Sequence, residues 1–138
     1  MAGPPENFAW LLRSRRGYLA TVGSDGTPHI FPVCFTWAGE AIFTAVDEDA
    51  RGTPERQRLA DIQSNPKVSF TVDRWDEDWS RRAWLQARGK ARIVPSGVES
   101  DRARKALASK YNQYLESPAT GPVVRIEVDR WAAWEPEV

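Results

Sequence analysis

The stretch GYLATVGSDGTPHIFPV, residues 17–33, decides the fold. Its YLATVG segment at 18–23 is rich in strand-forming residues, and Ser24 to Thr27 then supplies turn residues. Gly26 is suited to that turn because glycine takes a positive φ at little cost. The next segment, HIFPVCFTW at 29–37, predicts a second strand that pairs with the first as a hairpin. Pro32 has no N–H to donate to a ladder, so this strand should lie at an edge or contain a bulge.

Outward from the hairpin, strands alternate with short helices. The patterns predict further strands at 41–46, 67–73, 82–94 and 122–135, with Gly89 as a bulge in the long strand at 82–94. They predict helices at 6–16, 55–64 and 97–115. Every link between strands before residue 46 is short, which favours antiparallel pairing. We therefore expect one α+β domain over residues 1–138 with six strands.

The composition is that of an ordinary globular protein. The 138 residues are 41% hydrophobic and 28% charged, with 19 basic residues balanced by 19 acidic ones. This balance gives no reason to expect binding to nucleic acid or to an anionic membrane. No segment approaches the roughly 20 apolar residues of a membrane-spanning helix, and the N-terminus lacks a secretory pattern. With one cysteine, no internal disulfide is possible, so we expect a cytoplasmic protein.

The residues offer few groups for acid–base, nucleophilic or metal chemistry. One cysteine and one histidine cannot by themselves form a structural zinc site, so no metal is expected. Cys34 lies between Val33 and Phe35, which predicts a buried and inert thiol. His29 begins a strand and is expected to be a surface or interface residue. Nucleophile-elbow, P-loop and dinucleotide-binding patterns are absent, and no catalytic residue can be assigned.

A basic cluster precedes and opens the predicted helix at 55–64; it consists of Arg51, Gly52, Thr53, Arg56 and Arg58. Guanidinium groups beside the N–H groups of a helix start would suit a phosphate. The same arginines would equally suit a solvated helix face that pairs with Glu55 or Asp61. The residues alone leave both interpretations open.

Tryptophan is unusually frequent. The chain has seven, namely Trp10, Trp37, Trp75, Trp79, Trp84, Trp131 and Trp134. They predict either a core rich in aromatic residues or a set of rings that lines a flat ligand or a dimer interface.

The chain resembles the pyridoxamine 5′-phosphate oxidase-like split-barrel superfamily over residues 8–134. The hairpin carries a D-G-x-P turn at 25–28, Phe43-Thr44-Ala45 follows, and Arg58 stands eight residues before Pro66 of an Asn-Pro step. More narrowly, it is similar to an actinobacterial subgroup of probable F420-dependent enzymes. The segments that carry this similarity are DEDWSR at 76–81, Trp84, GKA at 89–91, TGPV at 120–123 and Trp131.

The resemblance implies a six-stranded antiparallel split β-barrel with short flanking helices, which works as a homodimer with cofactor sites at its interface. It implies that Arg58, with Arg56, holds the cofactor phosphate. Pro32 and Val33 would lie along one side of the ring system, and Thr44 and Ala45 would lie along the next strand. Trp79 and Trp84 would close the site from the partner chain.

The chain also departs from the family pattern. Residues 51–55 read RGTPE where relatives of the subgroup carry a lysine-rich stretch. Trp84 stands where the oxidase has a polar group, and the C-terminus lacks the oxidase's arginine segment, which argues against pyridoxamine phosphate oxidation. We expect an F420-dependent oxidoreductase that transfers a hydride to a small conjugated substrate. An FMN-binding oxidoreductase, or a flavin or heme carrier without turnover, is the alternative; only His29 is available as a heme ligand.

Overall fold

The structure is a computed structural model that describes residues 3–46 and 53–137, with the backbone alone for Thr53 to Glu55. Its strands are β1 (Gly17–Val22), β2 (Pro28–Val33), β3 (Thr36–Ala38), β4 (Ala41–Ala45), β5 (Lys67–Arg74), β6 (Ala83–Val94) and β7 (Val123–Trp134). The helices are α1 (Thr53–Ser64), α2 (Val98–Lys110) and α3 (Gln113–Glu116), with short 3-10 helices η1 (Glu6–Arg13) and η2 (Trp79–Arg81). The α+β class is as predicted.

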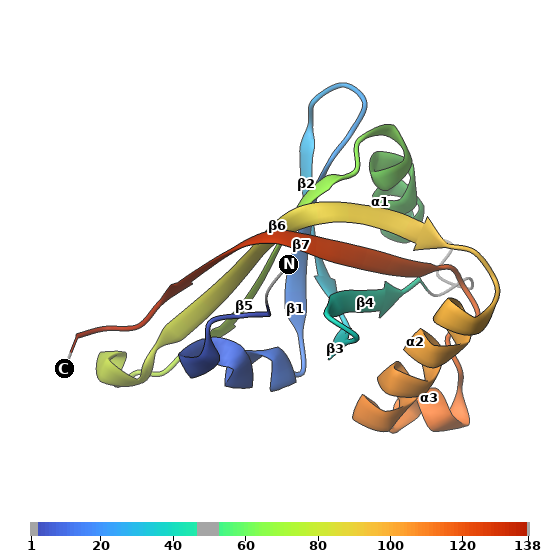
Figure 1. Cartoon of the computed structure of the whole chain (residues 1–138). Coiled ribbons are helices and arrows are strands. Elements are labelled where there is room, and N and C mark those ends of the chain that lie inside the picture. Colours follow the sequence, from blue (N-terminus) through green and yellow to red (C-terminus); the bar gives the residue numbers. More distant parts are fainter. Residues whose placement is uncertain (1–2, 47–52, 138) are drawn as a thin grey trace.

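The strands form one antiparallel sheet that is rolled into a half-barrel (Figure 1). The order is β2-β1-β5-β6-β7-β4-β3, so β2 and β3 are the two edge strands. Only Cys34 and Phe35 separate these edges along the chain. Because such a link spans at most about 10 Å, the two edges of the sheet must lie close together. We call the place where they meet, from Pro32 to Thr36, the seam.

The predicted strand at 29–37 is wrong in one respect: it is broken at the seam, so the sheet has seven strands among the described residues instead of six. Side chains from other elements replace the ladder partners at the break. The Phe35 N–H donates to the hydroxyl of Tyr111 over 3.1 Å. The hydroxyl of Thr44 donates to the Cys34 carbonyl over 2.7 Å. The backbone can leave the sheet there because its polar groups are satisfied in this way.

The break also corrects the prediction for Cys34, which is exposed and not buried. Its neighbours Val33 and Phe35 are both buried, at 6% and 0% exposed. Successive side chains of an extended chain point to opposite sides. The thiol therefore points outward between two residues that point into the core.

Both glycine predictions are confirmed. Gly26 takes φ +85° in the β1–β2 turn, where the Thr27 N–H also donates to the Asp25 carboxylate. The register of β6 against β7 shifts between Arg88 and Gly89, as expected for a bulge. A Cβ on Gly89 would lie 1.9 Å from the Glu127 carbonyl oxygen, so only glycine permits this approach of the two strands.

The helices differ from the predictions mainly at their ends. The helix predicted at 97–115 is two helices, α2 and α3, because Tyr111 is extended at φ −120° and ψ 109°. In that conformation its hydroxyl reaches the seam and donates to the Arg15 carbonyl over 2.9 Å. The helix predicted at 6–16 is the 3-10 helix η1, and α1 begins two residues earlier than predicted.

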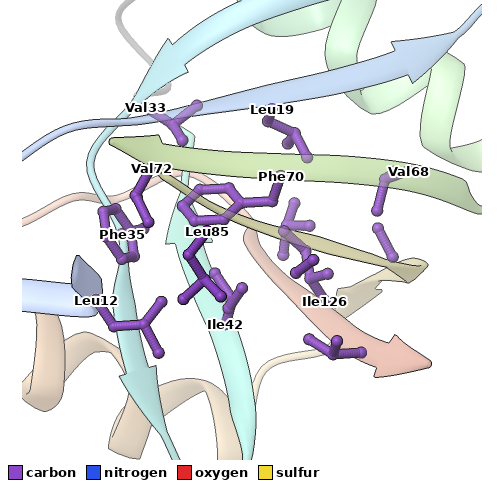
Figure 2. Close-up of a cluster of buried hydrophobic side chains, with 14 of the residues drawn as sticks. Leu12, Leu19, Val33, Phe35, Ile42, Val68, Phe70, Val72, Leu85 and Ile126 are labelled. Carbon is purple, nitrogen blue, oxygen red and sulfur yellow. The ribbon is translucent and has the colours of Figure 1, made fainter. Parts of the chain in front are cut away.

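The main core lies inside the curl of the sheet (Figure 2). Phe35 from the seam and Phe70 from β5 pack edge to face, with ring centres 4.7 Å apart. Leu12 of η1, Leu85 of β6 and Ile126 of β7 surround them. Among the described residues, no helix is long and apolar enough to cross a membrane.

Candidate functional site

The outer face of the sheet carries a row of exposed rings. Alternation along β1, β5 and β6 sends Leu19, Phe70 and Leu85 into the core and their neighbours outward. Large apolar side chains remain exposed on this outer side; they are Tyr18 at 37%, Ile30 at 69%, Trp84 at 38% and Trp134 at 41%. Trp84 lies opposite Trp134 in the β6–β7 ladder. Exposed apolar patches of this kind mark binding surfaces.

These side chains border a cavity of about 930 Å³, which we call the aromatic pocket. It is lined by Tyr18, Ala20, Ile30, Ser69, Thr71, Asp73, Arg74, Trp75, Arg82, Ala83, Trp84, Gln86 and Trp134. Predicted site residue Trp84 is part of this lining. Trp79 is not, but it contacts the lining residue Arg82.

One end of the pocket is formed by the loop from Trp75 to Arg82, which is well ordered by its own hydrogen bonds. Asp78 caps η2 by accepting from the Ser80 N–H over 3.1 Å. The Arg81 guanidinium lies 2.9 Å from the Asp76 carboxylate. Arg74 Nε donates to the Arg81 carbonyl over 2.5 Å, which ties the loop back to β5. The loop's own hydrogen bonds therefore hold it in place at the end of the pocket, and we call residues 75–82 the tryptophan rim.

Arg82 lies between two indole rings of this rim. Its guanidinium carbon is 4.0 Å from the ring centre of Trp79 and 4.8 Å from that of Trp75. Both rings are largely exposed, at 64% and 61%. Cation–π contacts with two rings restrict the position of the guanidinium.

The predicted ring-binding residues Pro32, Val33, Thr44 and Ala45 meet at the seam. Pro32 is exposed on edge strand β2, whereas Val33 is buried. Thr44 on β4 is 1% exposed and holds the Cys34 carbonyl, while Ala45 beside it is half-buried. Pro32 and Val33 belong to edge strand β2, whereas Thr44 and Ala45 belong to β4, which lies between β7 and β3. The Thr44–Cys34 hydrogen bond joins the two segments.

The predicted phosphate residues lie on α1, which packs on β1, β2 and β6. Arg56 is exposed there. Arg58 is 3% exposed, and its guanidinium carbon lies 5.8 Å from the ring centre of Phe31 on β2. Arg51 and Gly52 of the basic cluster lie outside the described residues. Of the two arginines, Arg56 is thus the one that faces solvent.

Within one chain, α1 and the tryptophan rim lie at opposite ends of the sheet (Figure 1). Lys67 begins β5 just after α1 and pairs with Lys90 of β6, whereas Trp84 stands six residues earlier on that strand. Six residues of strand span about 20 Å. The structure therefore does not bring Trp84 to α1 of its own chain.

A buried carboxylate, Asp61 of α1, was not singled out by the sequence as a structural centre. It is 1% exposed and accepts from Thr21 Oγ1 at 2.6 Å and Gln57 Nε2 at 2.8 Å, and it lies 2.7 Å from His29 Nδ1. Burial by itself would raise the pKa of Asp61, but the hydrogen bonds from Thr21, Gln57 and His29 outweigh it and hold that pKa below its ordinary value. Thr21 and His29 are 40 and 32 positions from Asp61, so the spacing of residues in the sequence gave no signal for these contacts.

Comparison with protein-family models gives a match to pyridoxamine 5′-phosphate oxidase over residues 4–135. The chain belongs to the pyridoxamine 5′-phosphate oxidase family. This places the half-barrel with the split barrels that the sequence resembles. No curated protein sequence matches the chain.

Solved structures with the same fold include proteins of different stated roles. A conserved hypothetical protein from Mycobacterium tuberculosis superposes with a TM-score of 0.78 at 21% identity, covering 98% of this chain and 86% of that one. HutZ, the heme storage protein from Vibrio cholerae, gives 0.73 at 17% identity, covering 97% and 95%. An F420 reductase gives 0.69 at 27% identity, covering 93% and 98%. The family fold is thus shared by redox and heme-storage proteins.

Proposed function

We propose that this protein binds coenzyme F420 at the seam and transfers a hydride between that cofactor and a small conjugated substrate, as a homodimer. The observation that carries the proposal is the seam itself, where an exposed strand edge, Thr44 and Ala45 lie near a helix that carries an exposed arginine. The likeness to an F420 reductase, at 27% identity over 93% of the chain, favours F420 over FMN.

The chemistry of the seam fits a flavin or deazaflavin ring. Among the described residues, edge strand β2 pairs with β1 alone, so its outer edge offers backbone N–H and C=O groups. Such a ring presents N–H and C=O groups along one edge and apolar surface elsewhere. Pro32, Val33 and Ala45 supply apolar contacts beside those backbone groups.

The cofactor phosphate would be held at the start of α1. The first backbone N–H groups of this 12-residue helix have no partner within the helix, and they favour an anion. Exposed Arg56 is placed to add a charge-assisted hydrogen bond. Arg58, buried beside Phe31, would add its positive charge from beneath the helix.

The bound cofactor would supply the hydride chemistry, while the chain binds, orients and shields it. No side chain at the seam is an obvious acid or base, since Thr44 already donates its hydroxyl proton to the Cys34 carbonyl. The protein's part would be positioning and exclusion of water.

We propose that the dimer forms through the outer face that holds the aromatic pocket. That face exposes Tyr18, Ile30, Trp84 and Trp134, more large apolar surface than a monomer of this size usually presents. An isologous pairing of this face would bring the tryptophan rim of one chain toward the seam of the other. Trp79 and Trp84 would then complete a site whose α1 lies about 20 Å from Trp84 within one chain.

Heme carriage is the second candidate, because HutZ shares the fold. The chain has one histidine, His29, and its Nδ1 lies 2.7 Å from Asp61 at the end of the hairpin. His29 is not among the residues that line the aromatic pocket. A carrier would therefore need a heme ligand other than a pocket histidine.

Parallel fluorescence and absorbance titrations with F420, FMN and hemin test the proposal. We expect saturable binding of F420 at one per chain, weaker binding of FMN, and no hemin band from an axial histidine. Substitution Arg56→Glu should weaken F420 binding, whereas Arg102→Glu, on the exposed face of α2, should not. Tight hemin binding without F420 or FMN binding would favour the carrier.

A further inference from the structure

We propose that Arg82 is the anion-recognition residue of the aromatic pocket, so that the pocket takes a planar, conjugated ligand that carries a carboxylate. As a statement about the substrate, this inference rests on the proposed function; as a statement about the pocket, it stands on Arg82 and its surroundings. It narrows the expected substrate from any small conjugated molecule to an anionic one.

The shape and lining of the pocket favour a flat ligand. Its walls are the rings of Tyr18, Trp75, Trp84 and Trp134 together with Ile30, and its volume is about 930 Å³. A ring that enters this space stacks on aromatic faces and buries apolar area. The lining also carries polar side chains, among them Ser69, Thr71 and Gln86, that can orient a ligand.

The two cations that line the pocket have no carboxylate partner among the described residues, and they differ in the hydrogen bonding of Nε. Three charged residues line the pocket: Asp73, Arg74 and Arg82. Arg74 donates from Nε to the Arg81 carbonyl and stacks on Trp10, with its guanidinium carbon 4.5 Å from that ring centre. Within the described part of the chain, no carboxylate lies within ion-pair distance of Arg82. The neighbouring Arg81, by contrast, is paired with Asp76.

The surroundings of the Arg82 guanidinium suit binding of a ligand anion more than exposure to water. Its side chain is half-buried, and its guanidinium carbon lies 4.8 Å and 4.0 Å from the ring centres of Trp75 and Trp79. Its Nε atom is buried and has no hydrogen-bond partner among the described residues. A buried N–H donor without a partner is costly. The rim therefore presents a fixed planar fork whose donors match the two oxygens of a carboxylate.

A structural role makes a different prediction. If Arg82 serves only to pair with a carboxylate of the second copy, or to hold the rim, its loss should weaken the dimer or the fold. The affinity of the pocket would then be the same for a charged ligand and a neutral one. The two roles are separated by comparing a carboxylate with its neutral amide.

The experiment is isothermal titration of the full-length protein with 2-naphthoate and with 2-naphthamide, which differ in charge and little in shape. Wild type should bind the carboxylate about 10- to 150-fold more tightly, the range that a charge-assisted hydrogen bond gives. Arg82→Gln should remove this preference and leave naphthamide binding within about twofold. Arg82→Lys should keep part of it, because charge survives without the planar fork.

Arg88→Gln is the matched control, since it removes the same charge from an exposed position on β6, the strand that follows Arg82, outside the pocket lining. It should retain the wild-type preference. Equal affinity of wild type for the two naphthalenes, or the same preference in Arg82→Gln, would overturn the inference.

Cofactor titration and light scattering of the same variants separate the possible failures. If Arg82→Gln weakens F420 binding as much as naphthoate binding, Arg82 holds the cofactor and the inference about the substrate is wrong. If it changes only the dimer equilibrium, the structural role is correct. If wild type prefers naphthoate but binds neither F420 nor FMN, the pocket inference stands and the proposed function fails.

Discussion

His29 Nδ1 lies 2.7 Å from Oδ2 of Asp61, and this contact joins edge strand β2 to α1. Thr21 of β1 donates to the same oxygen over 2.6 Å. One buried carboxylate thus fixes α1 against the hairpin that opens the sheet. Because Arg56 lies on α1, the same contacts set the position of that residue relative to the seam.

Asp61→Ala should lower the free energy of unfolding by about 3–5 kcal/mol, the usual cost of removing one partner from a buried charged network. The substitution leaves the donors of Thr21, Gln57 and His29 without an acceptor. Urea unfolding at neutral pH measures the loss. Glu135→Ala, an exposed acid near the C-terminus, should change stability by less than about 0.5 kcal/mol. Equal effects of the two substitutions would contradict the role of Asp61.

The same carboxylate should give a defined acid dependence. Its pKa is held below 3.8 in the folded protein, so the unfolded chain binds this proton more readily. The stability that it contributes is present above pH 3.8 and is lost as pH falls through the lower folded value. Urea unfolding from pH 6 to the acid limit should therefore show a steeper fall for wild type than for Asp61→Asn. Parallel curves would show that Asp61 is not held in this way.

Lys110 should give a dependence of the same sign in alkali. Burial, and secondarily the charge of Arg15, lowers the pKa of Lys110 from 10.5 to about 8 in the folded protein. Between these values the unfolded chain binds the additional proton, so stability should rise with pH across this window. Lys110→Met should remove that rise relative to wild type, and Lys105→Met, on the same helix, should not. The difference between variants is the measured quantity, because it removes the contributions that the variants share.

Gly89→Ala should disrupt the β6–β7 pairing. The new Cβ would lie 1.9 Å from the Glu127 carbonyl oxygen, and backbone, unlike a flexible side chain, cannot move aside cheaply. The cost should exceed the roughly 1–3 kcal/mol of ordinary overpacking. Thermal unfolding measures it, and a loss below about 1 kcal/mol would show that the bulge opens easily. A variant that fails to fold agrees with the prediction only if Ala87→Gly, on the same strand, still folds.

The sequence predicted the parts of the fold that depend on local chemistry. Three features follow from the backbone chemistry of one residue each: the turn at Gly26, the edge position of Pro32 and the bulge at Gly89. The predicted strand at 67–73 agrees with Lys67–Arg74 for a similar reason, since apolar and polar residues alternate along it.

Features that depend on distant partners were missed. The strand break at Cys34 requires two side chains from elsewhere in the chain. Thr44 is 10 residues from its acceptor Cys34, and Tyr111 is 76 residues from its donor Phe35. The exposure of Cys34 follows from that break. In the candidate site, Trp84 lies in the lining of the aromatic pocket, and its separation from α1 depends on strand register. That these residues bind a cofactor, and that Trp79 and Trp84 reach it from the partner chain, stay predictions.

Charge placed on the outer face should dissociate the proposed dimer. Ile30 is 69% exposed at the border of the aromatic pocket, so Ile30→Asp should cost the fold little but put a charge into the interface. Light scattering at micromolar concentration should give a dimer for wild type and a monomer for Ile30→Asp. Val98→Asp, at an equally exposed apolar position on α2, should remain dimeric. A monomeric wild type would contradict the proposal that two chains share one site.

The central claim is that the cofactor site combines the seam and α1 of one chain with the tryptophan rim of the other. Its most direct measurement is F420 titration of mixed dimers made from Arg56→Glu and Trp84→Ala chains. Each variant alone should bind F420 at least about 10-fold more weakly than wild type. Mixed dimers place both substitutions in one site and leave the other intact, so one site per mixed dimer should regain wild-type affinity. Mixed dimers that bind no better than the parent variants, while wild type binds tightly, would contradict the account.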